Sequence, residues 1–321
     1  MKRTMQGPLF LFLAFTLAGT SVVAARFLSG RLGVFTITAV SLTVAVLFLL
    51  PLCLKKLVQT VKGLSCKDFL SLAVQALFGI FLFRLFLLNG LTITSSAEAG
   101  ILTSAAPAMT AVMAIVFLKE KPTAQKLIGI ALTASGVLMI QWAAGGGSGF
   151  TREHLWGNML VICAAACEAL FNIFSRAFLH SPKRGAKEPM DPAVQTALVS
   201  CLALLLCLIP AMGEKPIVSL TLLPLSGWLA LLWYGVFVTA LSYICWYAGI
   251  KRCGALTAAA FSGMMPFTSA LLSMVMLHER LHPFQLLGGL FIMGGMIGLG
   301  VCAAGEGLTS AVTKRVETDC R

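Results

Sequence analysis

Long apolar runs alternate with short polar, glycine-rich or proline-rich segments along the whole chain. A helix that crosses the hydrocarbon core of a bilayer needs about 20 mostly apolar residues, and ten runs approach or reach that length. The breaks carry loop residues, as in the glycine cluster at 145–149 and the proline-rich segment 181–192. The pattern predicts an all-α polytopic membrane protein with ten transmembrane helices, over residues 8–28, 34–54, 69–89, 97–118, 124–142, 156–178, 193–211, 222–247, 255–277 and 284–303.

Composition supports a membrane protein. Of the 321 residues, 58% are hydrophobic and 11% are charged, and the mean hydropathy is +0.92. A soluble domain has about 45–50% apolar and about 25% charged residues, so a water-soluble fold could not hide this much apolar surface. Most of the ten cysteines lie inside apolar runs, without zinc-finger spacing. We therefore expect no metal, disulfide framework or cofactor.

The second half of the chain repeats a pattern of the first. Each matching residue recurs 159 positions later with no gap, which indicates internal duplication. The predicted units are a first repeat over 8–142, a linker over 143–154, a second repeat over 155–303 and a tail over 304–321. The matching pairs are Pro107 and Pro266, Glu120 and Glu279, Gly129 and Gly288, and Gly136 and Gly295.

Lysine and arginine predict how the chain is oriented. Loops rich in these residues stay in the cytoplasm. With both termini in the cytoplasm of a cell (inner) membrane, most of the 24 Lys and Arg residues fall on the inside, so the net charge of +12 does not indicate nucleic-acid binding. Five helices per half is an odd number, so the second repeat enters inverted, as in secondary transporters. The predicted outer loops hold only Arg31, Arg152, Lys215 and Arg280.

Both copies of the pattern begin with small residues, Thr94-Ser95-Ser96-Ala97 and Ala255-Leu256-Thr257-Ala258, ahead of the matched proline, glutamate and glycines. The doubled pattern resembles the EamA domain of the drug/metabolite transporter superfamily over almost the whole chain. The resemblance implies a ten-helix carrier whose central cavity is lined by the first, third, fourth, sixth, eighth and ninth helices. It also implies a small-molecule substrate and allows a homodimer, but it does not give the cargo.

Arg84 lies inside the third apolar run. A charge near the centre of a bilayer costs about 2.5–3.5 kcal/mol, so the side chain should face the protein interior or water. Two interpretations remain open, namely a cavity role and an arginine that snorkels to the outer surface. The residue 159 positions later, Tyr243, is also polar.

Glu168 lies almost at the centre of the run 156–178. A short carboxylate cannot snorkel that far, so it should be protonated, paired or facing water. It could serve as a proton relay or cation partner, or form a structural hydrogen bond to a neighbouring helix. Asn172 follows one helical turn later on the same face.

Other residues carry weaker hypotheses. Pro107 and Pro266 lie within spans and would kink their helices, as hinges or as ordinary packing features. Glu98 could be a gate, or could only favour a helix N-terminus. Tyr243 and Trp246 could form a stacking wall in the cavity or belong to the interfacial aromatic belt.

The segment His278 to His282 matches the H-E-x-x-H zinc motif. Pro283 follows directly and disfavours the helical geometry that the motif needs, and Glu279 is already explained by the repeat. The sequence therefore favours a secondary active transporter that exports small metabolites, amino acids or drugs by alternating access, with proton coupling as an option. The alternatives are a non-transporting membrane scaffold and a membrane-embedded zinc hydrolase; otherwise no enzyme activity is expected.

Overall fold

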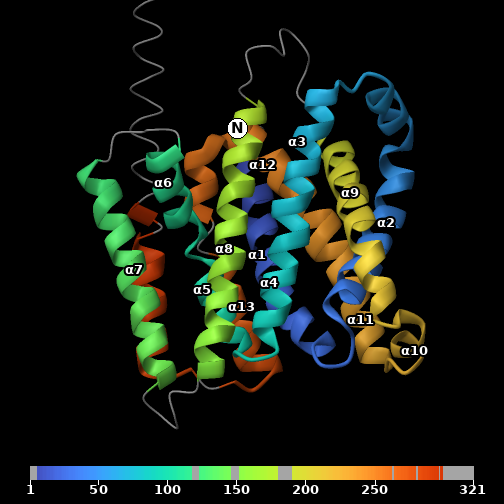
Figure 1. Ribbon diagram of the computed structural model, residues 1–321. Coiled ribbons are helices and arrows are strands. Elements are labelled where there is room, and N and C mark those ends of the chain that lie inside the picture. Colours follow the sequence, from blue (N-terminus) through green and yellow to red (C-terminus); the bar gives the residue numbers. More distant parts are fainter. Residues whose placement is uncertain are drawn as a thin grey trace, which may run out of the picture.

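The computed structural model describes residues 6–117, 123–145, 152–179, 190–261, 264–279, 281–295 and 297–298, and every regular element in these ranges is a helix (Figure 1). In chain order they are α1 (Gln6–Leu28), α2 (Val34–Lys62), α3 (Cys66–Ala76), η1 (Leu77–Leu82), α4 (Phe83–Leu91), α5 (Ser96–Thr103), α6 (Ala106–Phe117), α7 (Ala124–Gly145), α8 (Arg152–Leu179), α9 (Pro192–Gly213), α10 (Pro216–Thr221), α11 (Leu225–Trp233), η3 (Tyr234–Leu241), α12 (Ser242–Phe261) and α13 (Met264–Met276). A final described helix covers Pro283–Gly295.

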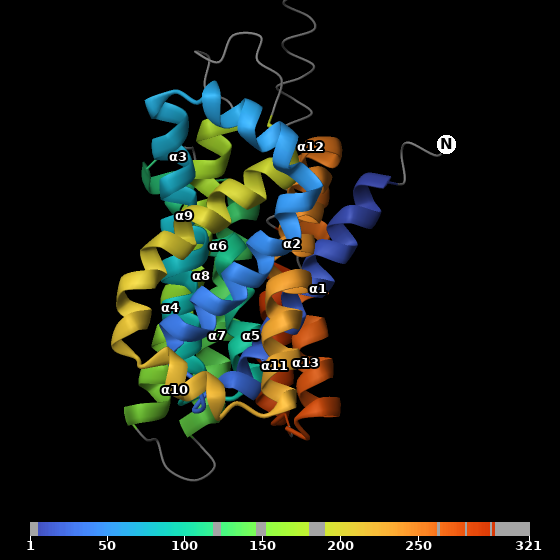
Figure 2. The same cartoon turned by 90° about the vertical axis from the view of Figure 1, so that its right-hand side faces the viewer.

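The helices pack side by side, with their ends gathered at two opposite faces (Figure 2). Six segments of the described chain are long and apolar enough to cross a membrane, and Leu127–Met139, Met264–Met276 and Pro283–Gly295 are shorter apolar helices. The predicted all-α membrane architecture is therefore confirmed. The six longer segments are Gln6–Leu28, Val34–Lys62, Cys66–Leu91, Glu153–Phe174, Pro192–Gly213 and Leu225–Ile250.

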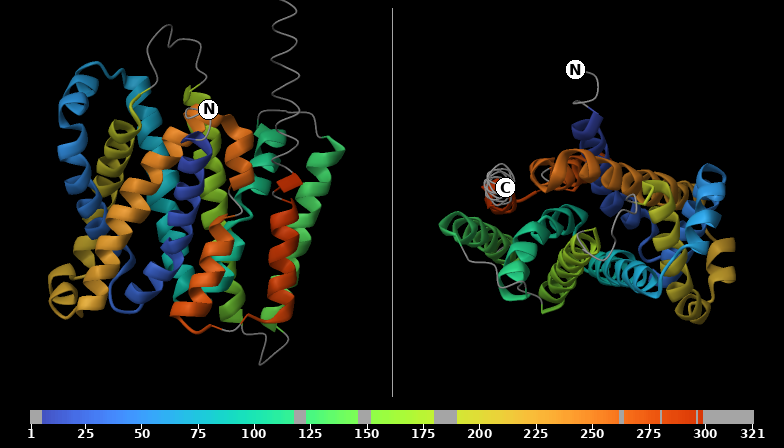
Figure 3. Two further views of the ribbon diagram at one scale, coloured as in Figure 1. Left: turned by 180° about the vertical axis from the view of Figure 1, so that it is seen from behind. Right: turned by 90° about the horizontal axis from the view of Figure 1, so that it is seen from above.

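Helix α1 packs against α12, α13, α11 and η3 (Figure 3). Its Leu11, Val22 and Leu28 are fully buried. In lipid, apolar burial alone does not bring helices together, so small residues that allow close contact matter more. Gly19 is one such residue, because an added Cβ would lie 2.6 Å from the carbonyl oxygen of Met265 at the start of α13.

The repeated glycines pack against one another within the molecule. A Cβ at Gly136 would lie 2.5 Å from Gly288 O, and a Cβ at Gly295 would lie 2.5 Å from Gly129 O. These contacts join α7 to the final helix. Intramolecular packing therefore accounts for these four positions, whereas an added Cβ at Gly294 or Gly298 would have no atom within 4 Å.

Pro107 does not kink a continuous helix as predicted. The fourth span is interrupted at Ser104 and Ala105, and α6 then begins one residue before Pro107. Likewise, Pro266 is the third residue of α13. Proline fits the first turn of a helix, where its missing N–H would have no intrahelical partner. The backbone break therefore precedes Pro107, and the loss of a mid-helix hydrogen bond predicted there is wrong, whereas residues 262–263, just before α13, lie outside the described residues.

The expected boundary between the eighth and ninth spans also differs. Helix α12 continues to Phe261, past the loop predicted after residue 247, so the predicted ninth span 255–277 starts inside α12. Glu120 lies outside the described residues.

Candidate functional site

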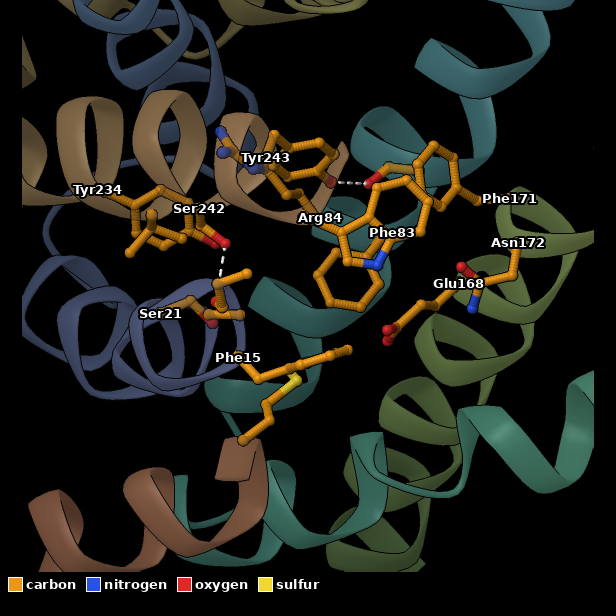
Figure 4. Close-up of a pocket in the computed structure, with 16 residues that line it drawn as sticks. Phe15, Ser21, Phe83, Arg84, Glu168, Phe171, Asn172, Tyr234, Ser242 and Tyr243 are labelled. Atoms are coloured by element: carbon orange, nitrogen blue, oxygen red, sulfur yellow. Dashed lines mark hydrogen bonds between the residues drawn. The ribbon is translucent and has the colours of Figure 1, made fainter. Parts of the chain in front are cut away.

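A pocket with about 750 Å³ of empty space, its open mouth included, lies between helices from both halves of the chain (Figure 4). The walls come from α1, η1, α4, α8, η3, α12 and α13. All five residues predicted to bind or couple substrate line it: Arg84, Glu168, Asn172, Tyr243 and Trp246. The other lining residues are Ala14, Phe15, Ala18, Ser21, Gly79, Phe83, Phe171, Tyr234, Val238, Ser242 and Met265.

Arg84 extends from α4 into the interior and is only 4% exposed. Its Nη1 donates a 2.8 Å hydrogen bond to Ser41 Oγ, and its Nη2 donates to Thr239 Oγ1. The guanidinium carbon lies 4.5 Å from the centre of the Tyr234 ring, which is a cation–π contact. Within the described residues these partners are all neutral, and no carboxylate pairs with Arg84. The side chain therefore faces the interior rather than the outer surface, and a bound anion would find a positive charge there.

Glu168 extends from α8 toward the open space of the pocket (Figure 4). Its Oε2 is buried and has no hydrogen-bond partner among the described residues. An acceptor left unsatisfied in the interior costs about 1–3 kcal/mol, and more when it is charged. Asn172, one turn along α8, lines the same pocket. The site therefore has an acceptor available for a proton or for a cationic group.

Two π-helical segments, η1 and η3, border the pocket at matching positions of the repeat. The Tyr243 hydroxyl, in the second half, donates a 2.8 Å hydrogen bond to Gly79 O in η1. In the opposite direction, Arg84 donates to Thr239 in η3. Tyr243 follows Arg84 by 159 residues, so the two residues occupy the same position in the two repeats. Each donates a hydrogen bond to the other half of the chain. Such π segments occur often at functional sites.

Aromatic rings form one wall of the pocket. Phe171 lies 5.4 Å from Trp246 and 6.2 Å from Tyr243, measured between ring centres. Gly79 makes room for Phe171, because a Cβ there would lie 2.5 Å from the Phe171 Cδ2 atom. Tyr243 and Trp246 are thus part of the interior wall rather than an interfacial belt.

Several lining and supporting residues were not predicted from the sequence. Tyr234, Ser41 and Thr239 surround Arg84, but serine, threonine and aromatic residues are common in apolar helices and gave no distinct signal. One signal was available on α1, where Ala14, Ala18 and Ser21 have helical spacing and face the pocket.

Glu98, Pro107 and Pro266 do not line this pocket. Glu98 does lie in the first turn of α5, and its N–H donates to Ser95 Oγ. The residue is however only 3% exposed, and its carboxylate accepts hydrogen bonds from Thr94 and Gln285. It therefore does not lie at an exposed helix end. His278 has a φ of 54° and the segment leading to Glu279 is not helical. This part of the zinc-like motif therefore lacks helical geometry.

Comparisons with known proteins identify a family and similar transporters. The model of the EamA-like transporter family matches residues 5–142 and 155–301. The uncharacterized transporter YetK of Bacillus subtilis is 32% identical over 92% of this chain and 87% of its own length. The aromatic amino acid exporter YddG of Ancylobacter novellus is 24% identical over 63% of this chain and 66% of its own. A solved crystal structure with 20% identity covers 93% of this chain and 97% of its own, with a TM-score of 0.60, which indicates the same fold.

Proposed function

Since the chain belongs to the EamA-like transporter family, we propose that it is a secondary active exporter that moves a small organic solute through the Glu168 pocket by alternating access. A multi-pass membrane transporter needs a polar site away from lipid, near the interface of its repeats. The observation that carries the proposal is the Glu168 carboxylate, which faces the pocket with a buried and unpartnered oxygen among the described residues.

The proposed topology has ten membrane spans and cytoplasmic termini. In it, α5 and α6 together form the fourth span, and α13 and the final helix form the ninth and tenth. The two five-helix units are inverted relative to each other. Support comes from the 159-residue repeat and from the π segments η1 and η3 at matching positions.

The proposed substrates are zwitterions with an aromatic or large apolar group, such as aromatic amino acids. Arg84 offers a positive charge to a carboxylate, and Glu168 offers an acceptor to an ammonium group. The ring of Phe171 and its aromatic neighbours would stack on the apolar part of the solute. A relative whose name describes an aromatic amino acid exporter supports this substrate class.

Proton coupling follows from the same carboxylate. If Glu168 holds either a proton or the ammonium group of the solute, the inward flow of protons drives the solute outward. Each opening of the pocket then exchanges one for the other. A carboxylate that is buried but reachable from the pocket suits this exchange.

The test is uptake into inside-out vesicles, with L-phenylalanine as the first probe and with or without a proton gradient. The wild-type protein should accumulate the probe only with the gradient. Glu168→Gln should abolish accumulation while the protein still inserts, and Glu153→Gln, the same change at an exposed position of α8, should leave it intact. Full transport by Glu168→Gln at every pH tested would exclude the proposed role.

A further inference from the structure

Two glutamates outside the pocket connect the two halves of the chain at one end of the bundle. Glu279 follows α13 in the second half, and its carboxylate accepts hydrogen bonds from the backbone N–H groups of Ser96 (3.2 Å) and Ala97 (2.9 Å). These N–H groups open the first turn of α5 in the first half, where a helix has no internal acceptors. A negative charge at this position also interacts favourably with the helix dipole.

Glu98 makes the reverse connection, from the first half to the second. Its Oε2 lies 3.4 Å from His154 Nε2 at the start of α8 and 3.4 Å from Asn158 Nδ2. Its Oε1 accepts a hydrogen bond from Gln285 Nε2 in the final helix. Thr94 Oγ1 donates to the same carboxylate at 2.8 Å. One carboxylate therefore contacts two elements of the other half, α8 and the final helix.

The helices under these contacts are packed closely. A Cβ added at Gly100 in α5 would overlap Ser269 Oγ in α13. Figure 1 places α5 and α13 at the same end of the bundle, and they are in direct contact. Met265, at the start of α13, lines the pocket. A separation of α13 from α5 would therefore open the pocket toward this end.

We propose that Glu98 and Glu279 are positioning residues whose contacts, here called the latch, hold this end of the transport pathway closed. Both sets of contacts break when the pathway opens at this end. This inference rests on the proposed transport function, since it assigns the latch to one state of the alternating cycle. The contacts between the two halves suit reversible closure because each joins a carboxylate to an N–H group. Water can satisfy both partners once α13 and the final helix move away.

The test measures how accessible position 265 is, and it needs no substrate. Met265→Cys is placed in a background without the ten native cysteines. A membrane-impermeant maleimide is added to right-side-out and to inside-out vesicles. Glu279→Ala and Glu98→Gln should raise the labelling rate about tenfold from one side only, because hydrogen bonds to a charged group shift an equilibrium by this order. Initial export rates should fall in parallel.

The matched control is Glu214→Gln. Glu214 also follows a helix of the second half and caps a helix of the first, accepting from Phe35 N (3.1 Å) and Thr36 N (2.7 Å) at the start of α2. It lies outside the α5–α13 contact, so labelling and export should stay at the wild-type level. If Glu279→Ala is not recovered folded, Glu279→Gln is measured instead.

Unchanged labelling in both latch variants would overturn the inference, and so would an equal rise in the Glu214 control. Failure of the proposed function has a different signature. If the pocket does not carry solute, the latch variants still raise labelling but no variant changes export. Glu168→Gln should leave the labelling rate unchanged, because Glu168 takes no part in the latch contacts.

Discussion

Arg84→Lys tests whether the geometry of the guanidinium, rather than its charge alone, holds the site together. Arginine reaches Ser41 on α2 and Thr239 on η3 with two different nitrogen atoms, and it lies over the Tyr234 ring. A lysine keeps the charge but has a single nitrogen, which cannot occupy both positions. The substitution should therefore lose at least one hydrogen bond of a charged donor.

The size of the effect follows from that loss. A hydrogen bond to a charged group contributes about 1.5–3 kcal/mol, and every 1.4 kcal/mol is about tenfold in an equilibrium constant. If Arg84 also binds the solute carboxylate, the apparent affinity should fall roughly ten- to hundredfold. Thermal stability in detergent should drop by a few degrees, since the protein also loses a cross-helix contact.

The assay is transport of L-phenylalanine by protein reconstituted into liposomes. The dependence of the transport rate on L-phenylalanine concentration and the melting temperature of the protein are measured on the same preparations. Arg26→Lys is the control, because Arg26 is exposed and donates instead to a backbone carbonyl, Leu91 O. Its transport should match the wild-type protein. Wild-type affinity in Arg84→Lys would refute the assigned geometry, and so would an equal loss in the Arg26 control.

Three further predictions concern other contacts between helices. Tyr243→Phe removes the hydrogen bond to Gly79 O and should cost about 0.5–1.5 kcal/mol of stability and slow transport; an unchanged melting temperature would contradict it. Glu214→Ala should lower the melting temperature, at a cost of about 0.5–2 kcal/mol for a lost cap, with normal transport per folded molecule. Burial opposes the charge of Asp191, but the hydrogen bond from Lys56 and its charge hold the pKa of this carboxyl below its usual value. The stabilising effect of the ionised Asp191 should be present above about pH 4 and should be lost as the pH falls through the lower folded pKa. Asp191→Asn should therefore flatten the acid side of the plot of melting temperature against pH. A plot identical to that of the wild-type protein would contradict this prediction.

Much of the architecture was predictable because lipid imposes strong rules on sequence. Apolar run length predicted the helices, and a charge inside a run was expected to face the interior or water unless it could snorkel. These rules made Arg84 and Glu168 candidates for the pocket, with snorkelling left open for Arg84, and Tyr243 followed as the register partner of Arg84.

The remaining features depend on three-dimensional contacts that leave little trace in sequence. The partners of Arg84 are a serine and a threonine, Ser41 and Thr239, which are ordinary residues of membrane helices. The π segments carry no distinctive residue pattern. Pro107 signals a break but does not locate it, because proline is equally compatible with a kink and with the first turn of a new helix. The repeat identified Glu279 as a matched position, but only the fold shows that it caps α5.

Exchange of a proton for solute at Glu168 can be measured directly. Purified protein in weakly buffered detergent solution is mixed with L-phenylalanine, and a pH indicator reports proton release. The wild-type protein should release close to one proton per bound solute, whereas Glu168→Gln should release none and Glu153→Gln should behave as wild type. Solute binding without proton release by the wild-type protein, or equal release by Glu168→Gln, would contradict the account.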